Sequence, residues 1–153
     1  MEAGKGEKKM SIAIPQYNIR DTKKRYSELN NIALKGIEVI TYNANNEEEK
    51  VSHIKTTHLD RLLDNLSFCP IVDLDDVLGI YTVALNEIDL YGEGNTVETA
   101  VINLIDSILQ FLIIYIDKID LFSKVESDTK QLYLLKLLRC NGDKEQIKKV
   151  IGY

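Results

Sequence analysis

The sequence has few of the residues from which catalytic and metal sites are usually built. Its 153 residues include only two cysteines and two histidines. Cys69 and Cys140 lie far apart and outside any metal-type spacing, so we expect reduced thiols, as in cytoplasmic proteins. His53 and His58 have no cysteine or acid at ligand spacing, which favours ordinary surface or half-buried imidazoles over a metal site.

Long apolar segments are also scarce. The N-terminal stretch Met1–Met10 is charged and lacks the apolar core of a signal peptide. The most apolar stretch, Ile108–Ile116, is far shorter than a membrane span, and Asp106 and Asp117 flank it. We therefore expect a buried helix there, no membrane partner and a cytoplasmic location.

No complete catalytic or cofactor motif is found. Gly92-Glu93-Gly94 lacks the third glycine of a dinucleotide-binding fingerprint and is typical of a strand-to-helix turn. Asp73, Asp75, Asp76 and Asp89 could mimic a magnesium site, but Asp75-Asp76 falls where a hairpin turn favours acids. We predict no catalytic residue, no metal and no cofactor. A small metal-dependent hydrolase or nuclease that uses Asp73 and Asp89 remains the enzymatic alternative.

The charge is divided unevenly along the chain, whose net charge is −5. Residues 1–35 hold eight Lys/Arg and four acids (+4), and residues 36–153 hold eleven and twenty (−9). With 44% hydrophobic and 28% charged residues, the composition is that of a globular protein with one domain or two small ones. The charge division suggests two partners of opposite charge, although a basic tail with solvated faces would give the same pattern.

Turn residues and hydrophobic periodicity predict two units in an α+β fold. The first, residues 10–66, is expected to contain a strand at Ser11–Pro15, a helix from Asp21 or Thr22 to about Leu34, a hairpin of Ile37–Tyr42 and Glu49–Thr56 around Asn43–Asn46, and a helix Leu59–Leu66 capped by Thr57. Gly36 is expected to end the first helix.

The second unit, residues 67–153, is predicted as a β-sheet with a long helix and short closing helices. Its expected elements are strands Phe68–Leu74, Ile80–Leu85 and Ile88–Tyr91, a turn at Asp75–Gly79, a loop at Gly92–Asn95, and helices Leu132–Arg139 and Asp143–Ile151. The long helix is capped by Thr96, and its predicted apolar stripe is Ala100, Val101, Leu104, Ile105, Ile108, Leu109, Leu112 and Ile116.

A basic segment at the start of the first helix is the best candidate binding site. Arg20, Lys23 and Lys24 share one helix face, so they could neutralise phosphates while the opposite face packs. Asn18 could read a base edge. The predicted DNA-binding residues are Tyr17, Asn18, Arg20, Lys23, Lys24 and Arg25. A merely solvated helix face would have the same charges.

These segments resemble a known family. Four segments, taken in order along the chain, resemble the N-terminal domain of prevent-host-death (Phd)/YefM antitoxins. They are Ser11-Ile-Ala-Ile-Pro15, Ile19-Arg-Asp-Thr-Lys-Lys-Arg-Tyr-Ser-Glu-Leu29, Gly36-Ile-Glu-Val-Ile-Thr41 and Thr57-His-Leu-Asp-Arg-Leu-Leu63. Thr22-Lys23 stands where Ala-Arg is usual. The family's hairpin has a short basic turn, whereas Ala44–Glu49 is longer and acidic. We therefore restrict the predicted DNA contact to residues 17–25.

The second half also resembles antitoxins. Ile80-Tyr-Thr-Val-Ala-Leu85, Gly94-Asn-Thr-Val-Glu-Thr-Ala100 and Leu132–Cys140 are similar to the C-terminal module of Firmicutes antitoxins, and the small sheet is similar to that of HicB-type antitoxins. The resemblance implies a RelB/HicB-like module that recognises a toxin or supplies oligomer contacts.

Together the two resemblances imply an antitoxin of a type II toxin–antitoxin system. Its partners would be a cognate toxin, plausibly a RelE-like ribonuclease, operator DNA, and a second copy in a homodimer or higher oligomer. The alternative is a protein-interaction module that does not bind DNA, which the acidic hairpin and the net charge of −5 favour.

Overall fold

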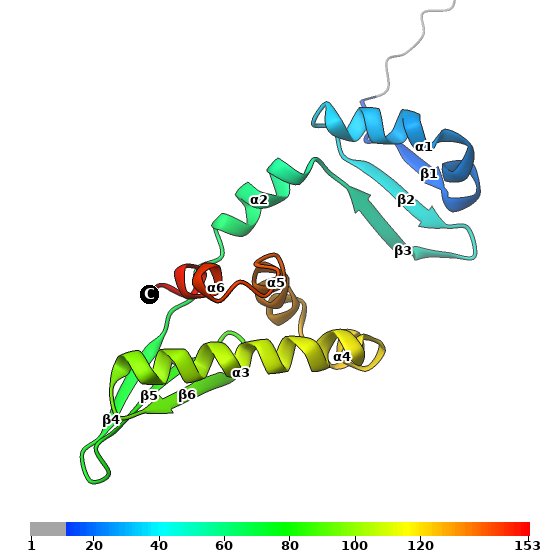
Figure 1. The fold of residues 1–153 in the computed structure, drawn as a ribbon. Coiled ribbons are helices and arrows are strands. Elements are labelled where there is room, and N and C mark those ends of the chain that lie inside the picture. Colours follow the sequence, from blue (N-terminus) through cyan, green and yellow to red (C-terminus); the bar gives the residue numbers. More distant parts are fainter. Residues whose placement is uncertain (1–11) are drawn as a thin grey trace, which may run out of the picture. The chain divides into compact units, whose positions relative to one another are not determined.

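The chain has the α+β architecture that its sequence predicts, in a computed structural model that describes residues 12–153. This part of the chain divides into two compact units, one ending at Leu62 and the other beginning at Leu63. Each unit contains one three-stranded sheet (Figure 1). The helix α2 (Thr56–Asp64) carries the chain from one unit into the next.

In the first unit, β1 (Gln16–Asn18) runs parallel to β2 (Val39–Asn43), which pairs with β3 (Asn46–His53) in antiparallel fashion. The strand predicted over residues 11–15 is wrong, with Ser11 outside the described residues. Pro15 precedes the strand instead of ending it, because proline lacks an N–H but keeps its carbonyl as an acceptor. That carbonyl accepts a hydrogen bond from the Ile40 N–H at 3.0 Å.

The helix α1 (Ile19–Leu34) begins earlier than predicted because Asn18, and not Asp21 or Thr22, caps it. The Asn18 Oδ1 accepts a hydrogen bond from the Arg20 N–H at 3.0 Å. The predicted end at Gly36 is confirmed: this residue has φ +93°, and its N–H donates to the Ala33 carbonyl at 2.9 Å. One face of α1 covers a small core of Leu29, Ala33 and Val39.

The predicted hairpin is confirmed, but its turn is shorter than the sequence suggested. Ala44-Asn45 alone connects the strands, and Glu47, Glu48 and Glu49 belong to β3. The register of the two strands shifts between Tyr42 and Asn43, which accommodates these extra residues as a bulge. The helix that follows begins at Thr56, so the predicted start at Leu59 with a Thr57 cap is wrong.

In the second unit, β4 (Ile71–Asp75), β5 (Ile80–Leu85) and β6 (Leu90–Gly94) form an antiparallel meander. The bounds of β5 are as predicted, whereas β4 begins three residues late, after Pro70. The loop predicted at Gly92-Glu93-Gly94 is wrong, since these residues form the end of β6. A Cβ on Gly92 would lie 2.3 Å from the Ala100 carbonyl oxygen, so the glycine serves close packing instead of a turn.

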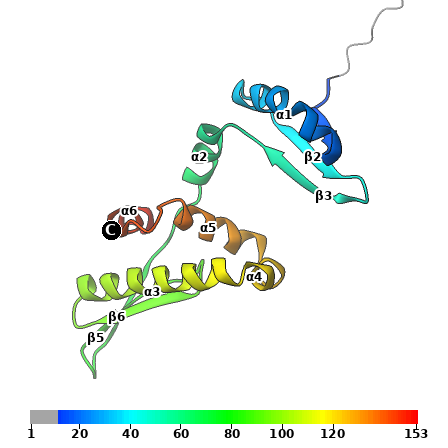
Figure 2. The same ribbon diagram turned by 45° about the vertical axis from the view of Figure 1, so that its right-hand side comes forward.

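The long helix α3 (Val97–Asp117) is capped by Thr96, as predicted, and forms the core of the second unit. Figures 1 and 2 show the sheet on one side of α3 and the C-terminal helices on the other. The predicted stripe is buried except for Leu109, which is half-buried, and Ile116, which is 58% exposed. Tyr115 is buried in place of Ile116 because its ring packs against Phe122, with the ring centroids 5.5 Å apart.

With 21 residues, α3 is long and apolar enough to span a membrane by length and composition alone. The expectation that the apolar stretch is too short for a span is therefore wrong on that criterion. Seven side chains of α3 are buried in the core of the second unit, whereas Ile102, Ile113, Ile114 and Ile116 are exposed.

Three shorter helices close the chain: α4 (Ile119–Val125), α5 (Asp128–Leu138) and α6 (Lys144–Ile151). The helix α4 was not predicted, and α5 starts four residues before the predicted Leu132 because Ser127 caps it. Asp143 is the N-cap of α6 and not its first residue; its carboxylate accepts hydrogen bonds from the Glu145 and Gln146 N–H groups.

Candidate functional site

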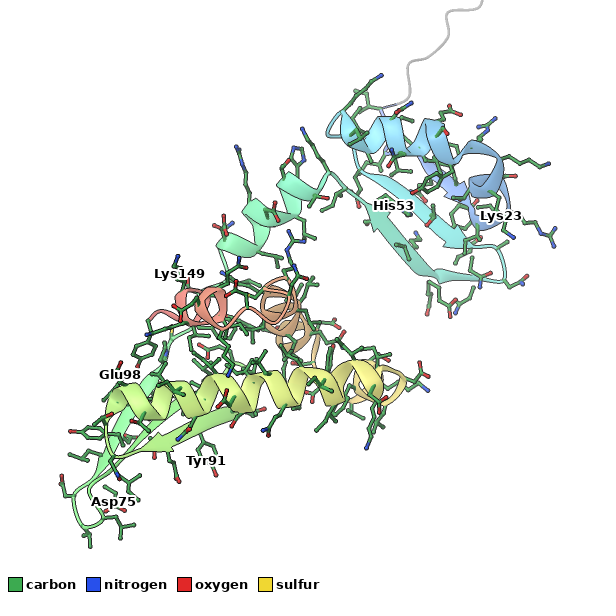
Figure 3. The ribbon with its side chains drawn as sticks, viewed as in Figure 1. Lys23, His53, Asp75, Tyr91, Glu98 and Lys149 are labelled. Atoms are coloured by element: carbon green, nitrogen blue, oxygen red, sulfur yellow. The ribbon has the colours of Figure 1, made fainter. Side chains whose placement is uncertain are left out.

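The basic residues predicted to bind DNA lie around the start of α1. Arg20, Lys23 and Lys24 are exposed, and their spacing of three and four residues places them on neighbouring positions of the helix surface. Arg20 and Lys23 line a hollow of about 420 Å³. The side chains are therefore available to an anionic ligand, and Figure 3 shows Lys23 extending from the first unit.

The β2–β3 turn forms the other wall of this hollow. Asn43, Ala44 and Asn45 line it opposite Arg20 and Lys23. The prediction from the sequence excluded this hairpin because of its acids, but those acids lie in β3 and not in the turn. The Asn43 amide is used within the hairpin, because its Nδ2 donates a hydrogen bond to the Glu49 carboxylate at 3.3 Å and its Oδ1 accepts one from the Asn45 N–H at 3.0 Å. The Asn45 side chain beside the cations therefore suits contacts to phosphates and base edges better than that of Asn43. The asparagine-rich turn was the signal in the sequence that could have identified these residues.

Asn18 also lines the hollow, but its first role is structural. Its Oδ1 is used by the Arg20 N–H, and its backbone carbonyl accepts a hydrogen bond from the Thr22 hydroxyl at 3.1 Å. Only the side-chain NH₂ group remains as a donor toward a ligand. The cap therefore uses one of the backbone N–H groups that the start of a helix offers to an anion.

Tyr17 and Arg25 form a separate pair. Tyr17 is half-buried against the small core of the first unit, and the Arg25 guanidinium lies over its ring, 5.8 Å from the centroid. Arg25 has non-helical backbone angles (φ −121°, ψ 17°), which kink α1. The contact is a cation–π interaction that anchors Arg25 beside β1. The main role of Tyr17 is therefore to pack against the core, and contact with a ligand is secondary.

Three of the other candidate ligands, His53, Asp75 and Asp89, have structural partners. The His53 Nε2 lies 3.1 Å from the Thr41 hydroxyl, Asp75 accepts hydrogen bonds from the Val77 and Leu78 N–H groups, and Asp89 pairs with Lys130. Within residues 12–153, no three His, Cys, Asp or Glu side chains are grouped to hold a metal ion.

Both cysteines are free thiols. Cys69 is exposed and Cys140 is buried. Burial, aided by Asp143, raises the pKa of the Cys140 thiol. A raised pKa keeps this thiol protonated and unreactive, which fits a core residue.

The second unit contains a long segment in which all the charged side chains are acidic. Residues 62–117 contain ten carboxylates and no Lys, Arg or His. This segment includes all of β4, β5, β6 and α3. Basic residues return from Lys118 onward, where Lys130 pairs with Asp89 and Lys144 pairs with Asp106. The sheet side of the unit is therefore suited to a cationic partner.

The sequence also matches a known protein family. Residues 14–152 match the model of a family described as the antitoxin of toxin–antitoxin systems of the RelE/RelB type. The chain belongs to this antitoxin family.

A solved structure supports the same fold for this antitoxin. The proposed antitoxin part of a toxin/antitoxin system from Syntrophomonas wolfei subsp. wolfei superposes with a TM-score of 0.67. The match covers 88% of this chain and 94% of the other at 15% identity, so it shows the fold alone. No curated protein matches the antitoxin. Membership of an antitoxin family implies a cognate toxin as partner and a regulatory protein in place of an enzyme.

Proposed function

We propose that this antitoxin binds its own operator through the first unit and neutralises its toxin through the second. In this proposal residues 10–66 form a Phd/YefM-like unit that dimerises, and residues 67–153 form the toxin-binding unit. Two copies of the basic segment would contact half-sites about one DNA turn apart. The protein would act in the cytoplasm, where both partners are found.

The cluster of exposed cations around the hollow at the start of α1 carries the DNA-binding part. Arg20 and Lys23 line that hollow together with Asn43 and Asn45, and Lys24 is exposed next to Lys23 on the helix. Cations supply the phosphate contacts that dominate affinity, and amides supply contacts to base edges. The cations lie beside the Asn45 side chain at this surface, whereas the Asn43 amide is hydrogen-bonded to Glu49 and to the Asn45 N–H.

The acidic segment 62–117 supports the toxin-binding part. A toxin of the RelE kind would be a basic ribonuclease, and opposite charges speed the encounter of two such proteins. Blocking a basic nuclease with an acidic surface would also compete with its RNA substrate. The second unit therefore has the charge that this role requires.

A mobility-shift titration on the DNA upstream of the protein's own gene tests the operator contacts. We expect Lys23→Ala combined with Arg25→Ala to weaken binding and to lower the salt slope by about one for each phosphate that is no longer neutralised. Lys35→Ala is the matched control, because Lys35 is an exposed lysine at the opposite end of α1. A double variant that binds as tightly as the parent, with an unchanged slope, would show that the contacts are wrongly assigned.

A protein-interaction module without a DNA role is the second candidate. The glutamates of β3 and the net charge of −5 favour it. Co-purification with the product of the neighbouring reading frame, together with no shift of the upstream DNA by the parent protein, would select this candidate.

A further inference from the structure

The strand β4 (Ile71–Asp75) stands apart from the other strands of the second sheet because all five of its residues are exposed. Ile71, Val72 and Leu74 are between 44% and 45% exposed, although they are large apolar side chains in a strand. The central strand β5 is half-buried or buried throughout. The exposed strand is one of the two edges of the sheet, since β4 pairs only with β5 within the described chain.

The two edge strands of this sheet, β6 and β4, differ in their contacts with the rest of the unit. On β6, the Asn103 side chain of α3 donates a hydrogen bond to the Glu93 carbonyl at 2.7 Å, and Gly92 is buried beneath that helix. Among the side-chain hydrogen bonds described within residues 12–153, none reaches a backbone group of β4. An edge strand presents alternate N–H and C=O groups that can pair with another strand. The β4 edge therefore remains available as a template.

The strand also offers a distinct set of side chains on each face. The pairing of Val72 with the buried Val83 places Val72 and Leu74 on the side of α3, beyond the cover of that helix. Ile71 and Asp73 lie on the opposite side, the face from which Tyr91 extends in Figure 3. An added strand would meet apolar side chains on both faces and carboxylates at Asp73 and Asp75.

From these observations we infer that β4 binds a strand of the cognate toxin by β-augmentation, an inference that rests on the function proposed above. The occupant is an extended, basic segment of the toxin. Backbone hydrogen bonds to the edge would supply affinity, and side-chain pockets would supply specificity. Lysine or arginine on the added strand would lie opposite Asp73, and its apolar residues would cover Val72 and Leu74.

Charge complementarity favours a basic strand over a second copy of this chain. Antiparallel pairing of two β4 edges would bring the Asp73 and Asp75 carboxylates of both copies together, and like charges across paired strands are destabilising. The segment around β4 holds no cation to relieve this repulsion, because Lys, Arg and His are absent from residues 62–117.

The test uses the full chain and the purified product of the neighbouring reading frame as the probe. We expect Val72→Lys combined with Asp73→Lys to weaken binding by about tenfold or more, since lysines on an edge block strand addition and the charge is reversed. Asp75 is left unchanged because it accepts the hydrogen bonds that hold the turn. Thermal unfolding of each variant verifies that the fold is kept.

Glu93→Lys is the matched control. Glu93 is an exposed acid on the same face of the sheet as Asp73, in the row Asp73–Thr82–Glu93, but on the opposite edge. Equal weakening by the control and the edge variant would overturn strand addition in favour of binding to the sheet face or to general negative charge.

Hydrogen exchange provides a measurement that does not depend on a substitution. Complex formation is expected to slow exchange of amides in residues 71–75, while those of β6 change little. Unchanged β4 amides in a complex that forms normally would overturn the inference and leave the proposed function intact. Failure of the parent to bind the probe would overturn both. Protection of β4 in the protein alone that disappears on dilution would assign the edge to a second copy.

Discussion

At the scale of single residues, Asn18 combines two roles among the predicted DNA contacts, one in the helix cap and one at the candidate binding surface. Its Oδ1 caps α1, and the residue lines the hollow shared with Arg20 and Lys23. A cap and a ligand contact can therefore be separated chemically, because the cap needs only the oxygen.

We expect Asn18→Asp to keep the stability of the protein and to weaken operator binding. The aspartate retains the capping oxygen but replaces the amide donor with a charge that repels phosphate. Asn18→Ala should lose the cap and lower the free energy of unfolding by about 1 kcal/mol. Urea unfolding and the mobility shift separate the two effects.

Asn31→Ala serves as the control for these variants, because Asn31 is an exposed asparagine in the interior of the same helix. It should change neither property appreciably. Equal operator affinity for the parent and Asn18→Asp would remove Asn18 from the contact surface and leave it as a cap.

At the scale of secondary-structure elements, Lys130 links three parts of the second unit. Its Nζ lies 3.2 Å from the Asp89 carboxylate and 3.0 Å from that of Glu126, and 5.8 Å from the centroid of the Phe111 ring. Burial lowers the pKa of Lys130, but hydrogen bonds and charge from Glu126 and Asp89 outweigh it, so the pKa is raised above the ordinary 10.5.

A raised pKa in the folded state fixes the sign of the pH effect. The stabilisation is fully present below the unfolded value of 10.5 and is lost as pH rises through the higher folded value. We expect the parent to lose stability above about pH 10.5 more steeply than Lys130→Met. Urea unfolding at several alkaline pH values measures the free energy of unfolding of each protein. The difference between the two proteins cancels the effect of tyrosine ionisation, which is common to both. Parallel pH profiles would refute the linkage.

Elements with strong local signals could be predicted, and those defined by tertiary contact could not. The bounds of β5, the Thr96 cap and the Gly36 end were correct because periodicity, capping and positive φ are local properties. The β6 glycines were predicted as a loop because their role, to let α3 pack closely against the strand, depends on a tertiary contact. Pro15 was read as a stop because its carbonyl partner, the Ile40 N–H, is distant in sequence.

The same distinction applies to the candidate site. The exposure of Arg20, Lys23 and Lys24 followed from charge and helical spacing. The core position of Tyr17 was missed because it depends on the pairing of β1 with β2. Asn43 and Asn45 were missed because the strand bulge places the acids outside the turn, and no sequence pattern shows that register shift.

At the scale of the whole molecule, the charge division matches the proposed division of labour. Exposed cations gather at the start of α1 in the first unit, and residues 62–117 of the chain contain carboxylates without any base. A chain that joins two such surfaces can respond to DNA and to a basic protein at separate places. Neutralisation of the toxin is the central part of this proposal, since the chain belongs to a family described as the antitoxin of toxin–antitoxin systems.

Bacterial growth after induction of the neighbouring reading frame measures neutralisation most directly. We predict that induction alone arrests growth and that equal production of this antitoxin restores it. The antitoxin with Lys23→Ala and Arg25→Ala should restore growth equally well, because the toxin-binding unit is unchanged. Arrest that persists when both proteins are present in equal amounts would contradict the account.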